Sequence, residues 1–111
     1  MAAIEQDMDI IERTLCDRAQ FYSTPNSART LMSFDREHGQ FLLIDEGWDG
    51  YRRIHQLWAH IELRDHKFWV HEDGTEEGLA NLLLAAGVPR DHIVLAFSAP
   101  SLRKTSEFAV A

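Results

Sequence analysis

The stretch that decides the fold is residues 40–72, QFLLIDEGWDGYRRIHQLWAHIELRDHKFWVHE. It holds three runs rich in aliphatic and aromatic residues, and the breaks between them are Gly47-Trp48-Asp49-Gly50 and Asp65-His66. Runs of this kind, separated by short turn-forming breaks, predict strands joined by tight turns. With the run before them, which connects through Arg36-Glu37-His38-Gly39, the predicted strands are 30–35, 40–46, 51–64 and 67–72. Sequential strands with short turns favour an antiparallel meander.

The longest predicted strand, 51–64, does not alternate regularly. In its second half Leu57, Ala59, Ile61 and Leu63 share one face, opposite Trp58, His60, Glu62 and Arg64. Ile54 in the first half falls on the other parity. A β-bulge, which inserts one extra residue into a strand, would explain the change of parity.

Helices are predicted on both sides of the meander. Residues 2–22 place apolar side chains at helical spacing, and residues 23–26 (Ser-Thr-Pro-Asn) end that helix. The apolar positions are Ile4, Met8, Ile11, Leu15 and Tyr22. A second helix follows the meander, with apolar positions at Leu79, Leu82, Leu83 and Ala86.

The ends of the second helix carry recognisable signals. Asp73 and Glu76 have the spacing of a capping box, with Thr75 as an alternative cap, and Glu76 and Glu77 would then occupy the first turn. Gly87 supplies the left-handed stop. A last strand is predicted at 92–97, and the apolar Phe108 and Val110 predict that the tail packs.

The order helix, four strands, helix, strand predicts an α+β fold in a single domain, residues 1–111. An antiparallel sheet with helices packed on one face satisfies this order. The other face of the sheet would then be available to a partner.

Composition narrows the class of protein. The chain has 111 residues, a formal net charge of −7 and one cysteine, Cys16, so it forms no internal disulfide. The N-terminus carries Glu5, Asp7 and Asp9 and no apolar run long enough for a signal or a membrane span, so we expect a cytoplasmic protein without membrane association. Nucleic-acid binders usually carry basic surfaces, and the acidic balance disfavours that class.

We find no catalytic motif, and the sequence predicts no cofactor, metal or catalytic residue. The cluster Asp45, Glu46 and Asp49 would be the ligands of the alternative, a metal-assisted hydrolase. A direct DNA-binding module would use the basic pairs Arg52-Arg53 and Arg103-Lys104, if they converge. Trp48 stands between glycines, where a tryptophan serves either packing or binding.

Four segments together resemble one known family. They are residues 42–55 (LLIDEGWDGYRRIH), residues 69–81 (WVHEDGTEEGLAN), the pair Gly87-Val88-Pro89 with residues 91–95 (DHIVL), and the close at residues 107–111 (EFAVA). In this order they resemble the XisI-like family, the fdxN element excision controlling factor proteins, found mainly in cyanobacteria. The turn Asp65-His66-Lys67 departs from the family, which tends to have glycine at the histidine.

The resemblance implies a compact α+β domain that assists a site-specific recombinase during heterocyst differentiation without being a recombinase. Such proteins are typically encoded beside XisH-like proteins, which resemble nuclease-fold proteins. We therefore expect an accessory protein that binds an XisH-like partner and reaches the recombinase or DNA only indirectly. Trp48, Arg53 and His55 lie in the family-like motifs and are the best interaction candidates. Self-association into a homodimer through a sheet edge or face is an open alternative.

Overall fold

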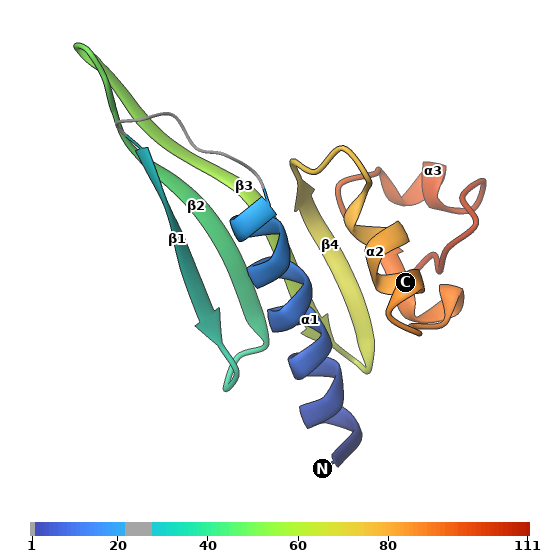
Figure 1. The fold of residues 1–111 in the computed structure, drawn as a ribbon. Coiled ribbons are helices and arrows are strands. Elements are labelled where there is room, and N and C mark those ends of the chain that lie inside the picture. Colours follow the sequence, from blue (N-terminus) through green and yellow to red (C-terminus); the bar gives the residue numbers. More distant parts are fainter. Residues whose placement is uncertain (1, 22–27) are drawn as a thin grey trace.

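The computed structural model describes residues 2–21 and 28–111 and shows helices packed on a five-stranded sheet (Figure 1). The helices and strands are α1 (Ala2–Phe21), β1 (Ala28–Asp35), β2 (Gln40–Asp49), β3 (Arg52–Arg64), β4 (Lys67–Asp73), α2 (Leu79–Ala85), the 3₁₀ turn η1 (Arg90–His92), β5 (Ile93–Leu95) and α3 (Pro100–Arg103). The predicted α+β class is confirmed. Tyr22 and the predicted helix end at residues 23–26 lie outside the described residues.

The sheet is the predicted meander with one added edge. Strands β1 to β4 pair in sequence order and antiparallel, and β5 pairs with β4 in parallel. The predicted turn at residues 47–50 was wrong, because β2 and β3 stay paired as far as Asp49 and Arg52. The reversal lies at Gly50-Tyr51, and Trp48 is therefore a strand residue opposite Arg53.

The suspected bulge in β3 is present, and it moves two side chains from their predicted faces. Leu43 pairs with Ala59 and Ile44 with Leu57, so Trp58 is the extra residue. Trp58 consequently packs against the core, whereas we predicted it on the opposite face. Leu57, predicted to share a face with Ala59 and Ile61, is turned to the other face and is 37% exposed. One added residue reverses the alternation on either side of it.

The core lies between the sheet and the helices α1 and α2. Ile11 and Leu15 of α1 are fully buried, and so are Leu79 and Leu83 of α2. They meet inward-facing strand residues, among them Phe41, Leu43, Ile61 and Val70. Complete burial of side chains of this size stabilises the fold by about 1.5–3 kcal/mol each.

The start of α2 differs from the prediction. The helix begins at Leu79 after Gly78, so Glu76 and Glu77 precede it and do not occupy its first turn. Asp73 ends β4, yet its Oδ2 accepts the backbone N–H of Leu79 at 2.8 Å. Asp73 therefore acts as an acceptor for the first helical N–H from six residues away, a distance that no local capping pattern predicts.

The C-terminal segment packs, as predicted, although the last strand is shorter than predicted. β5 is only Ile93–Leu95, since His92 belongs to η1. Phe108 packs against the core, and Ala109 bridges to Val94, but Val110 is 52% exposed. Within the described ranges, no helix has the length and apolar character needed to cross a membrane.

Candidate functional site

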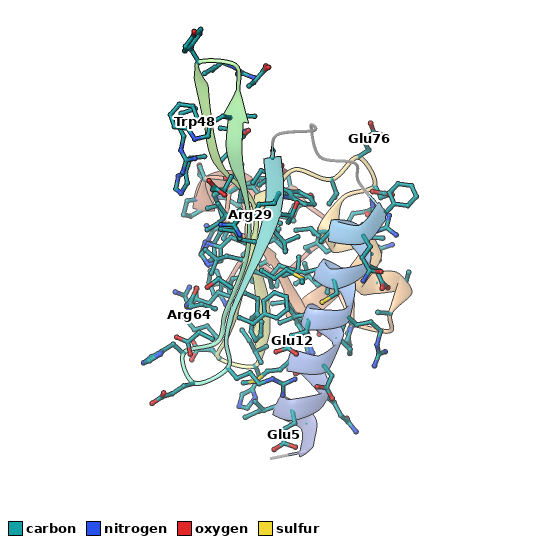
Figure 2. The ribbon with its side chains drawn as sticks, turned by 60° about the vertical axis from the view of Figure 1, so that its left-hand side comes forward. Glu5, Glu12, Arg29, Trp48, Arg64 and Glu76 are labelled. Carbon is teal, nitrogen blue, oxygen red and sulfur yellow. The ribbon has the colours of Figure 1, made fainter. Side chains whose placement is uncertain are left out.

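The candidate site lies on the sheet face that points away from α1, which we call the open face (Figure 2). Strand register assigns its side chains, because neighbours across paired strands point the same way. Figure 2 shows Trp48 and Arg64 on the side of the sheet away from α1. The open-face residues from β1 to β3 are Arg29, Leu31, Ser33, Asp35, Gln40, Leu42, Ile44, Glu46, Trp48, Arg53, His55, Leu57, His60, Glu62 and Arg64.

The open face continues onto a projecting hairpin. The ends of β2 and β3, residues 46–55, extend beyond the rest of the molecule, and we call this hairpin end the arm (Figure 1). Trp48 on the arm is 51% exposed, and Tyr51 at its tip is fully exposed. Large aromatic side chains held this far from the core contribute little to packing and are suited to contact with another molecule.

Glu46 organises the charged part of the arm. Arg29 donates from Nε to Glu46 Oε1 at 2.8 Å, and Arg53 donates from Nη1 to Glu46 Oε2 at 2.7 Å. These hydrogen bonds, that from Arg29 first, hold the pKa of Glu46 below its usual range. The Arg53 guanidinium also lies 5.2 Å from the centre of the Trp48 ring, so one arginine orients both the carboxylate and the indole.

The three predicted interaction residues are brought together on the arm. Trp48 lies directly opposite Arg53, and His55 lies opposite Glu46 one pair further along the same face. All three are exposed and face the same side of the sheet. Their spacing in sequence places them on neighbouring strands only because the hairpin turn falls at Gly50-Tyr51.

The two basic pairs do not converge. Arg52 lies near the tip and pairs with Asp49 at 3.5 Å, on the face opposite to Arg53. Arg103 instead lies beside Trp69, which pairs with Glu62. Glu62 lies nine positions after Arg53 on β3, roughly 30 Å along the strand. The predicted patch of Arg52, Arg53, Arg103 and Lys104 is therefore split between the two ends of the sheet.

Arg103 is held within its own chain. Its guanidinium donates to the carbonyl oxygens of Leu95, Ser98 and Ala96 at 3.2, 3.0 and 3.3 Å. It also donates to Val110 O at 3.4 Å. These bonds tie the segment after β5 to the end of the chain, which is a structural role.

The predicted acidic cluster is divided between faces. Asp45 accepts the hydroxyl of Thr30 at 2.7 Å on the α1 side of the sheet, while Glu46 lies on the open face with its two arginines. Asp49 pairs with Arg52 at the tip. Across residues 2–21 and 28–111, no three histidine, cysteine or acidic side chains lie close enough to hold a metal ion.

Apolar side chains cross the middle of the open face in one row. Leu31 lies opposite Ile44, and Ile44 lies opposite Leu57 on the next strand. Leu42 adjoins this row, one open-face position along β2 from Ile44. An apolar row between polar flanks has the composition of a protein contact surface rather than of a phosphate-binding surface.

Histidines join β2, β3 and β4 on the far side of that row. His60 donates from Nε2 to Gln40 Oε1 at 2.7 Å, and His71 donates from Nε2 to Glu62 Oε1 at 2.8 Å. The rings of His60 and His71 stack with their centres 4.6 Å apart. Burial lowers the pKa of His60, and the neighbouring charge of His71 lowers it further. Burial raises the pKa of Glu62, but hydrogen bonds from His71 and Gln40 outweigh it and lower the pKa overall.

We expect this pair to make the stability of the protein fall as the pH is lowered. The pKa of folded His60 lies below its ordinary value of 6.5, so the unfolded chain binds the proton more readily. The stability that neutral His60 contributes is therefore complete above pH 6.5 and is lost as the pH falls through its folded pKa. Thermal unfolding from about pH 8 to about pH 5 should show a falling midpoint that flattens in His60→Gln.

The matched control is His55→Gln, which removes an exposed histidine from the same strand outside the stacked pair. It should keep the slope of the parent protein over this pH range. Equal slopes in the parent and His60→Gln would contradict the role of the stacked pair. Below about pH 4.5 a second fall is expected, because Glu46 and Glu62 also have lowered pKa values.

Some residues of the open face were not singled out from the sequence. Arg29, which shares Glu46 with Arg53, belongs to a strand with no motif. The His60–His71 stack depends on a second irregularity, in which His60 pairs with Glu72 and Ile61 with Val70, so that His71 is extra. One signal of this arrangement was present in the sequence, since the parity of Ile54 indicated a bulge in the strand. The bulge, at Trp58, places Leu57 on the same face as Ile44.

Comparison with known proteins identifies a family and agrees with the fold. The family model described as XisI protein matches residues 1–110. Comparison with curated protein sequences gave no match.

Two solved structures from Anabaena variabilis ATCC 29413 are similar along nearly their whole length. One is a XisI-like protein with a TM-score of 0.92 and 26% identity, covering 97% of this chain and 99% of that chain. The other is the fdxN element excision controlling factor XisI, with a TM-score of 0.83 and 28% identity, covering 98% of this chain and 99% of that chain.

Proposed function

Because this chain belongs to the XisI protein family, we propose that it is an accessory protein that controls excision of a DNA element by binding an XisH-like protein. The excision step itself belongs to a separate recombinase in this proposal, and the chain supplies regulation rather than catalysis. One of the similar structures is an fdxN element excision controlling factor, and that name supports a regulatory role.

The observation that carries the proposal is the arm. It presents Trp48 and Tyr51 to solvent, places Arg53 and His55 on the same face as Trp48, and continues into the row of Leu57 and Ile44. Aromatic and arginine anchors next to an apolar centre are the usual composition of a protein–protein hot spot. The arrangement does not resemble a catalytic pocket, which is concave and gathers polar groups around a reacting atom.

The charge of the chain favours a basic partner. With 18 acidic and 11 basic residues the protein repels nucleic acid and attracts a protein that carries the positive surface needed to handle DNA. Direct DNA binding has less support, because the basic pairs lie at opposite ends of the sheet. A metal-assisted hydrolase has less support, because Asp45 and Glu46 lie on opposite faces.

The test is co-purification of this protein with the XisH-like protein encoded nearest to it, at low salt, followed by light scattering. We expect a complex of fixed stoichiometry that weakens as salt is added, because charge attraction between exposed groups is screened. Two separate proteins at low salt would contradict the proposal. Direct DNA or divalent-metal binding by the isolated chain would then become the leading alternatives.

Within that complex, Trp48→Ala should weaken binding at least tenfold, or about 1.4 kcal/mol, because a half-exposed indole on a projecting arm becomes buried on contact. The measurement is the dissociation constant by calorimetric titration, with thermal unfolding of the free variant to show that it folds.

Phe97→Ala is the matched control for Trp48→Ala, since Phe97 is an aromatic residue with 55% exposure, outside the arm. It should leave the dissociation constant unchanged. Unchanged binding by Trp48→Ala would remove the arm from the interface. Arg53→Gln distinguishes the contribution of the guanidinium from that of the indole, because it removes the guanidinium while keeping Trp48.

A further inference from the structure

The outer edge of the sheet is β1, and residues 29–35 of this strand pair with β2 alone among the residues that the structure describes. β1 runs from Ala28 to Asp35 and pairs only with β2 in the sheet order, and Figure 1 shows it at the margin of the sheet. The opposite edge is different, since β5 has three residues and Val94 already bridges to Ala109. Unpaired N–H and C=O groups along an edge strand are a template for another strand.

β1 lacks the features that usually prevent such pairing. Its sequence, ARTLMSFD, contains no proline, no glycine and no lysine, and charges stand only near its two ends. At its centre Met32 is 52% exposed. Protected edges are typically short, bulged, or interrupted by a lysine or proline at this central position.

The charges near the ends of β1 complement a second copy of the same strand. Arg29 and Asp35 both lie on the open face, whereas Met32, midway between them in the sequence, lies on the α1 side next to Cys16. When two β1 strands pair antiparallel about a twofold axis at Met32, Arg29 of each copy faces Asp35 of the other, and Leu31 faces Ser33. Such self-complementarity is what a twofold interface requires, because the same patch serves both subunits.

We propose that the protein forms a homodimer by antiparallel pairing of β1 with β1 of a second copy, centred on Met32. The two sheets then become one continuous sheet with both α1 helices on the same side. Main-chain hydrogen bonds and the Met32 contact hold the strands together, while the two exposed Arg29–Asp35 pairs set the register and contribute little to affinity. This inference stands independently of the proposed partner.

The first test is the mass in solution by light scattering across a range of concentrations. We expect the parent protein to have twice its 12.8 kDa chain mass, and Met32→Lys to have the chain mass alone, because two lysines would meet at the axis. Leu102→Lys is the control: Leu102 is a 62% exposed leucine on α3, and the variant should remain dimeric. A parent that is monomeric throughout, or a Met32→Lys variant that stays dimeric, overturns the proposal.

The second test fixes the register by disulfide formation. Directly opposite residues of antiparallel strands have Cα atoms about 4.5–5.5 Å apart, within reach of a disulfide. Met32→Cys should therefore cross-link to itself on mild oxidation, in a Cys16→Ser background because Cys16 Sγ lies 3.6 Å from the Met32 sulfur.

Ser33→Cys in the same background is the register control. The two copies of residue 33 would lie about 8 Å apart in this register, too far for a disulfide. Cross-linking of Met32→Cys without Ser33→Cys supports the register. Cross-linking of Ser33→Cys in preference to Met32→Cys overturns it.

Discussion

Replacing Gly39 by alanine should destabilise the protein by about 3 kcal/mol, because two separate costs fall on one methyl group. Gly39 has φ +67°, a left-handed conformation that costs an L-residue roughly 1–2 kcal/mol. The new Cβ would also lie 2.5 Å from Leu63 O, a backbone atom that cannot rotate away. The hydrogen bond from Leu63 N to Gly39 O, 2.8 Å, would lengthen as the two segments separate.

The hairpin between β2 and β3 supplies the matched control. Gly50 has nearly the same conformation, φ +62°, but no atom lies within 4 Å of the position its Cβ would take. Gly50→Ala should therefore cost only the backbone part, about 1 kcal/mol. Thermal or denaturant unfolding separates the two costs, and equal losses in both variants would contradict the role of the Leu63 contact.

Removing the Arg103 side chain should destabilise the protein by about 2–3 kcal/mol, because one guanidinium serves several carbonyl groups. Arg103→Ala leaves the oxygens of Leu95, Ala96 and Ser98 without this donor and uncovers the Trp69 ring. The loss should be concentrated in the C-terminal segment, so hydrogen exchange is the sharper measurement. We expect amides after β5 to lose protection before those of β2 and β3.

Lys104→Ala is the control for Arg103→Ala, because it changes the charge of the same basic pair by the same amount. It should alter stability by no more than about 0.5 kcal/mol. Arg103→Lys keeps the charge but not the planar fork, so it should recover only part of the loss. If Arg103→Ala and Lys104→Ala weakened DNA binding equally and left stability unchanged, Arg103 would belong to a nucleic-acid surface instead.

Alternation and turn residues were sufficient to predict the meander and both main helices. The patterns are local, since Asp65-His66 and Gly39 determine their turns from within the turn itself. The start of α2 was predicted too early because the acceptor for its first N–H is Asp73, on the preceding strand. A hydrogen bond between two segments separated by a loop cannot be predicted from the residue spacing of a local capping motif.

The site was predicted in part for the same reason. Trp48, Arg53 and His55 were recognisable as residues, but their common face depends on a turn two residues later than predicted. Arg29 could not be assigned, because a partner on another strand appears only with the register. The division of Arg52-Arg53 from Arg103-Lys104 is likewise a matter of distance along β3, which residue types do not encode.

The extra residue at Trp58 has a consequence for insertions and deletions in the arm of this chain. From Ala59 onward, burial in the core fixes which side chains of β3 face α1. In the arm, the face of each β3 residue depends on how many residues separate it from the bulge. Deleting one residue between His55 and the bulge would turn Arg53 and His55 towards the α1 side although both residues are still present. A deletion of two residues there would keep both side chains on the open face with Trp48.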